Sequence, residues 1–128
     1  MTKEQYLSHN YLSEDQFTIA TNRFINANYP ELRHFYFHVP NESNTNAATR
    51  IKLFNTGVLA GVPDFCFILP YLWFIELKML NGAISTKQKQ LHKLWKDNGI
   101  IVEVCRTAQE VVDVLNNHFK NQENGKEK

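Results

Sequence analysis

The amino-acid sequence predicts an α/β fold, a four-stranded mixed sheet flanked by helices, for a chain of 128 residues. Three observations lead to this prediction. Short apolar runs of strand length alternate with amphipathic segments of helical length. Three of the helical segments begin with a capping-box sequence, and two of the apolar runs lie close enough together to form a β-hairpin. The expected order is helix, strand, short helix, strand, strand, helix, strand and helix.

The first long helix follows a polar lead-in of residues 1–12, which we expect to be a short helix or irregular. Ser13 and Gln16 have capping-box spacing, so the helix begins there and runs to about Asn28. Pro30 ends it, because the residue before a proline avoids helical geometry. The side chains expected to face the core are those of Phe17, Ala20, Phe24 and Ile25.

A strand over residues 32–39 is expected next, with successive side chains on opposite sides of the sheet. The two sides would carry Phe35, Phe37 and Val39, and His34, Tyr36 and His38. Residues 40–46 are a polar loop by composition. A short helix over residues 47–55 follows, and Gly57 suits its C-terminal cap.

The hairpin occupies two apolar runs, residues 65–69 and 72–77, on either side of Pro70 and Tyr71. A turn at residues 81–82 follows it.

The second half of the chain adds a helix, a strand and a helix. Ser85 and Gln88 form the second capping box, which opens a helix that runs to about residue 98. Residues 100–105 are nearly all apolar, so we expect a strand covered on both faces and parallel to a neighbour, because it follows a helical crossover. Thr107 and Glu110 form the third capping box. The last helix would bury Val111, Val112, Leu115 and Phe119.

The expected domain covers residues 13–120, and residues 121–128 are expected to form a disordered polar tail. A hydrophobic content of 43% indicates a globular protein, and a net charge of +1 means that any surface for nucleic acid must be a local patch. The sequence shows no signal-peptide core and no apolar run of the roughly 20 residues that span a bilayer. Cys66 and Cys105 are expected to be reduced core thiols of a cytoplasmic protein rather than zinc ligands.

The hairpin carries three charged residues that an apolar segment should avoid: Asp64, Glu76 and Lys78. Buried charge is costly unless it is paired or bound to a metal. Glu76 and Lys78 lie two residues apart and therefore share a strand face. Two carboxylates beside an ammonium suit Mg²⁺ and metal-assisted hydrolysis of a phosphodiester. The plainer alternative is that Glu76 and Lys78 form a solvated strand face, and that Asp64 only shapes the turn after Pro63.

The metal site requires a particular register in the hairpin. A two-residue turn that pairs Leu69 with Leu72 would place Asp64 and Glu76 on opposite faces of the sheet. An odd-numbered connection, or a bulge of the same parity, places both carboxylates on one face. We therefore predict an odd-numbered connection or such a bulge. A three-residue loop, for example, would pair Leu69 with Trp73 and bring Asp64 opposite Lys78. Glu76 would then lie one step away on the same face.

With these residues placed, the chain resembles the VRR-NUC (virus-type replication–repair nuclease) branch of the PD-(D/E)XK nuclease superfamily. The resemblance covers residues 13–119, and the superfamily core has the order α-β-β-β-α-β. The pieces that match, in the family order, are His38-Val39-Pro40-Asn41, Pro63-Asp64, Glu76-Leu77-Lys78 and Ser85-x-x-Gln88.

The resemblance implies a set of roles. Asp64 and Glu76 would coordinate Mg²⁺ or Mn²⁺, with the backbone carbonyl of Leu77 as a further ligand. Lys78 would orient or activate the attacking water and offset charge in the transition state. The remaining catalytic candidate is Gln88, at the edge of the site, and Glu14 would supply a distal carboxylate from the first helix as a further metal ligand.

Several of these residues have a second explanation. Glu14 would interact favourably with the dipole of its helix whether or not it binds a metal, and Gln88 would complete the cap of its own helix. The two histidines His34 and His38 are expected to be polar strand residues rather than metal ligands. Asn41 could shape its loop or contact DNA. The candidate phosphate contacts are Arg50, Lys52, Lys89 and Lys93, although a run of lysines on a helix is usually a solvated face.

The function implied is a metal-dependent deoxyribonuclease, an endonuclease for branched or flapped DNA with a role in DNA repair. A homodimer that resembles Holliday-junction resolvases is expected, in a bacterial cytoplasm or in the host cell of a virus or mobile element. A chain of this length leaves no room for a separate DNA-recognition domain, which favours recognition of DNA structure. The alternatives are a catalytically inert DNA-binding or scaffold protein, and a restriction-type nuclease.

Overall fold

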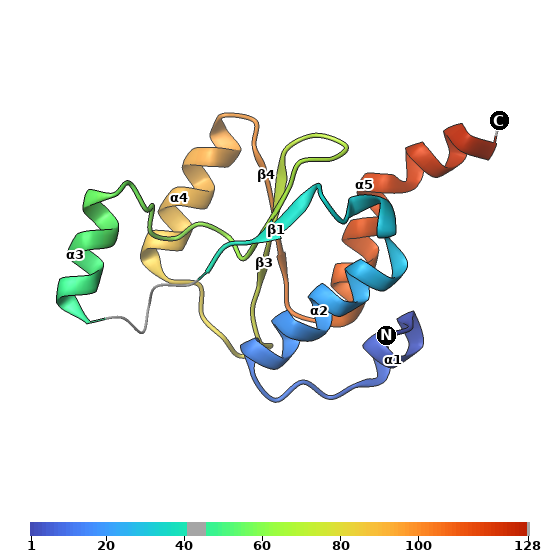
Figure 1. Cartoon of the computed structure of the whole chain (residues 1–128), viewed down its shortest axis with the longest axis horizontal. Coiled ribbons are helices and arrows are strands. Elements are labelled where there is room, and N and C mark those ends of the chain that lie inside the picture. The colour runs from blue at the N-terminus through green and yellow to red at the C-terminus, as the bar shows by residue number, and fades with distance from the viewer. Residues whose placement is uncertain (41–45, 128) are drawn as a thin grey trace.

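The structure, a computed structural model, describes residues 1–40 and 46–127, with side chains as far as Phe119 in the last helix. Four strands form one sheet in the order β1-β2-β3-β4 (Figure 1). The strands are β1 (Tyr36–His38), β2 (Phe65–Phe67), β3 (Trp73–Leu77) and β4 (Ile101–Cys105). The first three pair antiparallel, and β4 pairs parallel with β3. The α/β fold with a mixed four-stranded sheet is therefore confirmed.

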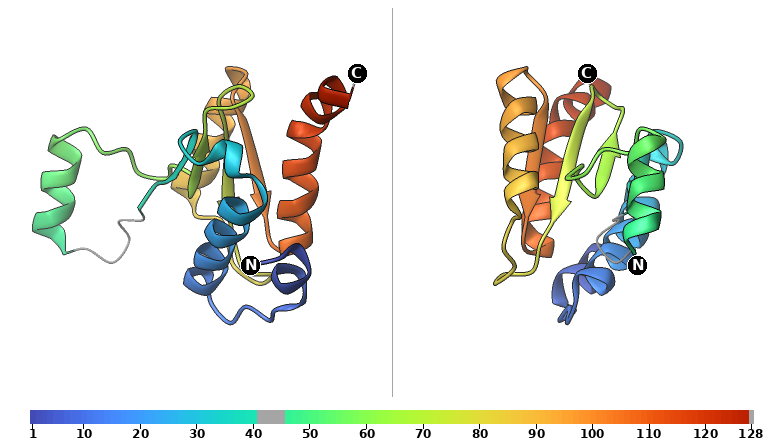
Figure 2. Two further views of the ribbon diagram at one scale, coloured as in Figure 1. Left: turned by 45° about the vertical axis from the view of Figure 1, so that its right-hand side comes forward. Right: turned by 90° about the vertical axis from the view of Figure 1, so that its left-hand side faces the viewer.

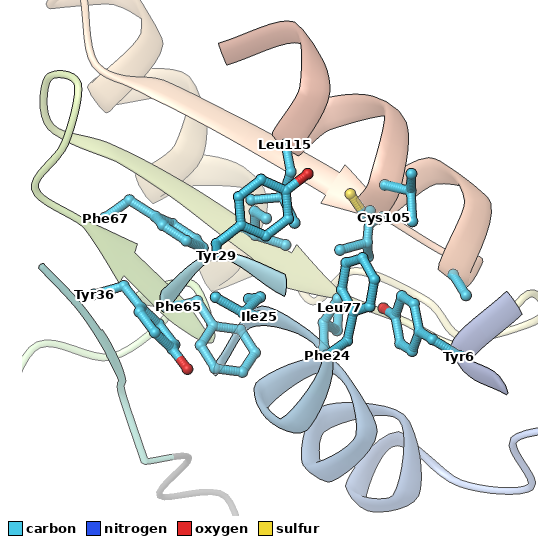
Figure 3. Packing of buried hydrophobic residues seen from close by; sticks show 14 of the residues in the cluster. Tyr6, Phe24, Ile25, Tyr29, Tyr36, Phe65, Phe67, Leu77, Cys105 and Leu115 are labelled. Atoms are coloured by element: carbon cyan, nitrogen blue, oxygen red, sulfur yellow. The ribbon is translucent and has the colours of Figure 1, made fainter. Parts of the chain in front are cut away.

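Helices cover both faces of this sheet. One face carries α2 (Glu14–Asn28) and α5 (Ala108–Glu127), and the other carries α4 (Thr86–Asp97) (Figure 2). Most of the core lies under α2 and α5, where aromatic rings from helices and strands pack together (Figure 3). A smaller cluster of Cys66, Phe74 and Val102 lies under α4. Both cysteines are buried and free, as expected.

The lead-in is helical and contributes to the core. Helix α1 (Lys3–Ser8) begins at a complete capping box formed by Thr2 and Gln5. Tyr6 is fully buried, and its hydroxyl lies 2.7 Å from the Thr21 hydroxyl of α2. An aromatic residue in a polar segment therefore anchors the N-terminus to the main core.

The three predicted N-caps are confirmed, and one of the three boxes is complete. Ser85 and Gln88 cap α4 reciprocally. Ser13 caps α2, but the Gln16 side chain accepts from the amide of Leu12 instead. The third box behaves in the same way. Its glutamate accepts from the amide one residue before the cap, so a capping sequence fixes where a helix begins better than it fixes the second hydrogen bond.

The expected strand over residues 32–39 is wrong in its first half. Pro30–Leu32 forms a 3₁₀ turn, η1, with the proline at its first position and Leu32 buried. Only Tyr36–His38 pairs with β2. The side that faces the core carries Tyr36, whose hydroxyl donates to Asn22 of α2, and the neighbouring Phe35 and Phe37 are exposed.

The hairpin has the predicted odd parity. Phe67 pairs with Trp73, so residues 68–72 form a connection of odd length. The connection is longer than the three-residue example, because Ile68 donates to the carbonyl of Phe35, the residue before β1, and the Trp73 indole donates to the carbonyl of Leu69. Continuing the ladder by one pair brings Asp64 opposite Glu76, not Lys78.

The C-terminal part differs from expectation in two respects. Strand β4 lies between α4 and α5 but at the edge of the sheet, so several of its side chains are only half-buried. Helix α5 continues to Glu127, through most of the segment expected to be a disordered tail. No proline interrupts the sequence after Phe119. Among the helices that the structure describes, none has the length and apolarity to cross a membrane.

Candidate metal centre

The main chain fixes Asp64 at the point where the chain enters β2. One carboxylate oxygen, Oδ2, accepts from the backbone amide of Leu77 on β3 at 2.7 Å. The backbone carbonyl of Asp64 accepts from the amide of Val39 at 2.7 Å and lies 2.9 Å from Nδ1 of His38. Because two segments of the chain hold this residue, the second carboxylate oxygen is presented in a defined direction.

Glu76 is the most buried charged side chain of the described residues, with 2% of its surface exposed. Its Oε1 accepts from Nε2 of Gln88 at 3.2 Å. Its Oε2 is buried without a hydrogen-bond partner among the described residues. Gln88 therefore fills both roles that the sequence left open, since the same side chain completes the cap of α4 and contacts Glu76.

The two carboxyls are held in an environment that disfavours their charge. Burial, followed by the neighbouring Asp64 carboxylate, raises the pKa of Glu76 to about 9. Burial also raises the pKa of Asp64, against the opposing effects of the Leu77 amide and the nearby Lys78 ammonium. The centre is therefore short of positive charge, as expected of carboxylates that a cation would bridge.

Glu14 completes a group of three carboxylates. It lies in the first turn of α2, and its oxygen, with one each from Asp64 and Glu76, belongs to a set whose members all lie within 4.8 Å of one another. Mg²⁺ binds oxygen at about 2.0–2.1 Å, so ligands around one ion lie roughly 3–4 Å apart. The three carboxylates and the unpartnered Oε2 of Glu76 fit a hard divalent cation. The Leu77 carbonyl and the choice between Mg²⁺ and Mn²⁺ stay predictions.

An open pocket of about 530 Å³ lies over this centre. Lys78 and Gln88 line it, together with two of the three carboxylates, Glu14 and Asp64. Gly61 forms part of the wall with a φ of +88°, and a Cβ there would lie 3.2 Å from the backbone oxygen of Lys87. A glycine is therefore needed where the loop before Asp64 passes the first turn of α4.

Two further cationic side chains line the pocket, Arg50 of α3 (Ala47–Asn55) and Lys87 of α4. Arg50 is a predicted phosphate contact, but Lys87 was missed. The sequence did carry a signal for Lys87, because a lysine in the first turn of a helix opposes the helix dipole and is favourable only near an anion.

The other predicted DNA contacts are not brought to the pocket wall. Lys52, Lys89 and Lys93 are exposed and lie outside the set of described residues that line it. Lys93 is paired with Asp97 at 2.8 Å. Asn41 lies outside the described residues. These four contacts stay predictions.

Comparison with known proteins supports the fold. No family model matches the sequence, and no curated protein matches it either. A solved structure described as a VRR_NUC domain protein superposes with a TM-score of 0.73 at 20% identity, covering 88% of this chain and 92% of that chain. The chain has a VRR-NUC-like fold. The expected PD-(D/E)XK-like core is therefore confirmed at the level of the fold, while identity this low leaves the roles of individual residues to chemical argument.

The VRR-NUC-like fold explains how distant parts of the sequence build one centre. Antiparallel pairing of β2 and β3 brings Asp64 beside Glu76, and helices on the two faces of the sheet add Glu14 from α2 and Gln88 from α4. The result is a pocket whose lining includes carboxylates, with Lys78 beside them and Arg50 and Lys87 as further cations. Such a pocket suits a phosphate group held next to a divalent cation.

Proposed function

We propose that this protein is a metal-dependent deoxyribonuclease that hydrolyses phosphodiester bonds in the pocket above Asp64 and Glu76. The observation that carries the proposal is the convergence of three carboxylates within 4.8 Å, one of them almost fully buried with an unpartnered oxygen. A catalytically inert DNA-binding or scaffold protein would gain nothing from such a group, because a buried carboxylate without a cation costs stability.

The residues of the chain have separate roles in this proposal. A Mg²⁺ or Mn²⁺ ion held by Glu14, Asp64 and Glu76 would supply Lewis acidity and a water of lowered pKa. The Leu77 amide and Gln88 hold the two central carboxylates in place. The ammonium Nζ of Lys78 donates to the attacking water or to a phosphate oxygen and offsets the charge that develops there.

The proposed substrate is DNA, and a branched or flapped form is favoured. Arg50 and Lys87 line the pocket, and in this proposal they contact phosphates of the bound strand. Such contacts position a strand without reading its sequence. A homodimer that places two pockets on one junction remains part of the proposal, as does a role in DNA repair.

The test is cleavage of duplex, flap and four-way-junction DNA with Mg²⁺, with Mn²⁺ and with EDTA. We expect cleavage only with a divalent cation and loss of cleavage in Asp64→Asn, Glu76→Gln and Lys78→Met, each with an unchanged circular dichroism spectrum. Lys3→Met, on the exposed side of α1, is the matched control and should cleave normally. Cleavage in EDTA, or normal cleavage by any of the three variants, would refute the proposed mechanism.

A further inference from the structure

Helix α3 is unusual because none of its nine residues is buried. It stands apart from the sheet and from the other helices in Figure 1 and in the left-hand view of Figure 2. Its apolar side chains are correspondingly exposed, with 79% of the surface of Phe54 accessible. The other large apolar residues exposed on α3 and the loop after it are Ile51, Val58 and Leu59. Exposed apolar groups of this kind mark a surface that binds something.

This apolar surface is continuous with the candidate metal centre. Leu59 is 54% exposed and lines the same pocket as Asp64. Arg50 lines that pocket from α3, and Phe54 lies four residues further along the helix. Residues four apart share a helix face, so the phenyl ring lies on the side of α3 that carries the guanidinium to the pocket.

The charge of α3 narrows the choice of partner. The helix carries Arg50 and Lys52 and no acidic residue. A second copy of the chain that docked through this surface by two-fold symmetry would bring the same cations face to face, which is unfavourable. A polyanion is the better match, and a cation beside an exposed aromatic ring is the combination with which proteins bind single-stranded nucleic acid.

The apolar part of the surface distinguishes between forms of DNA. A continuous duplex presents phosphates and sugars to a surface of this kind, and its base faces are stacked inside the helix. An unpaired base presents a free π face that stacks on an aromatic side chain. Phe54 and Leu59 could therefore make contacts with an unpaired nucleotide that they could not make with a duplex.

We propose that α3 and the loop after it bind unpaired nucleotides next to the phosphate in the pocket, with Phe54 stacked on a base. The inference rests on the proposed function and specifies its substrate as DNA with a single-stranded segment adjoining the cleavage position. Arg50 holds the phosphate of that segment, and Leu59 covers the edge of the stacked base.

The test measures binding, so it does not depend on cleavage. Glu76→Gln protein with Mg²⁺ is titrated into a blunt duplex and into the same duplex extended by a single-stranded arm carrying 2-aminopurine. Adding Phe54→Ala should weaken binding of the duplex with the single-stranded arm roughly 5- to 150-fold, as for loss of one stacked base. Quenching of the 2-aminopurine fluorescence should also be lost. Phe54→Trp should retain both effects, and Ile19→Ala, at another exposed apolar position, on α2, should change neither.

Two results would overturn the inference. The first is an equal loss of affinity for the blunt and the armed substrates, which would mean that the ring does not contact unpaired bases. The second is a wild-type dimer that Phe54→Ala converts to a monomer in sedimentation, which would show that a second copy covers α3. Absence of cleavage by the wild-type protein on every DNA would refute the proposed function, whereas the quenching experiment would still decide the role of Phe54.

Discussion

Replacing Glu76 with glutamine should stabilise the metal-free protein at neutral pH. The carboxyl is almost fully buried, and one of its oxygens has no partner in the described part of the chain. Glutamine has nearly the same shape and carries no charge. Its side-chain oxygen can still accept from Gln88, and its amide group can donate toward Asp64 as a protonated glutamate would. The substitution therefore mimics the protonated form without opening a cavity.

The size of the effect follows from the pKa of Glu76, which lies at about 9 in the folded protein against an ordinary value of 4.5. Between these values the folded protein keeps a proton that the unfolded chain releases, so stability falls as the pH rises. The slope is about 1.4 kcal/mol per pH unit for one proton. When the pH rises from about 5.5 to about 7.5, the free energy of unfolding of the wild type should fall by roughly 3 kcal/mol relative to that of the glutamine variant. This corresponds to a relative decrease of about 10 °C in Tm.

Thermal unfolding in EDTA at several pH values between these limits measures the effect. The Tm difference between Glu76→Gln and the wild type should grow with pH, and Mg²⁺ should raise the Tm of the wild type much more than that of the variant. Glu31→Gln, which removes an exposed carboxylate from η1, is the control. A variant less stable than the wild type in EDTA at about pH 7.5, or a difference independent of pH, would refute the account of a cation-deficient centre.

Three further predictions concern the pocket wall and the N-terminal anchor. Gly61→Ala should lower the Tm more than Gly57→Ala, because both positions have positive φ, +88° and +89°, but only at Gly61 would the new methyl group meet backbone, at 3.2 Å; equal decreases would contradict this. Arg50→Ala should reduce the slope of log affinity against log salt by roughly 0.7–0.9, the value for one phosphate contact, and an unchanged slope would remove that contact. Tyr6→Phe should cost about 1 kcal/mol in urea unfolding, since it deletes the hydrogen bond to Thr21, and no loss would mean that the bond adds nothing to stability.

The helices were the most predictable part of the fold, because their start signals are local. Ser13, Ser85 and Thr107 each cap a helix where the sequence places the cap. The ends of elements were less predictable. β1 is short because Pro30–Leu32 forms η1, which buries Leu32 in the core. Burial of this side chain determines the local structure there, and the alternation of side chains along the sequence does not reveal it.

The site residues whose positions follow from the geometry of a strand were predictable from the sequence. Those that reach the site only through the packing of a helix against the sheet were less predictable. Glu76 and Lys78 share a strand face by spacing alone. Glu14 was ambiguous, because an acidic residue in a first helical turn has a sufficient local explanation, and only the packing of α2 against the sheet brings it within reach of Asp64. The exposure of Phe54 had no sequence signal, since an aromatic residue on a short amphipathic helix would ordinarily be expected to pack inward.

The hairpin shows how far chemistry alone can determine a register. The demand that Asp64 and Glu76 share a face fixes only whether the connection is odd or even, so loops of three and five residues satisfy it equally. The structure has five, with the Trp73 ring stacked on Phe67 at 4.3 Å between centroids and its indole nitrogen bound to the carbonyl of Leu69. Those contacts shift the register by one same-face step, which moves Asp64 from a position opposite the lysine to one opposite Glu76. The longer loop therefore brings the two carboxylates into direct opposition, as a shared cation requires.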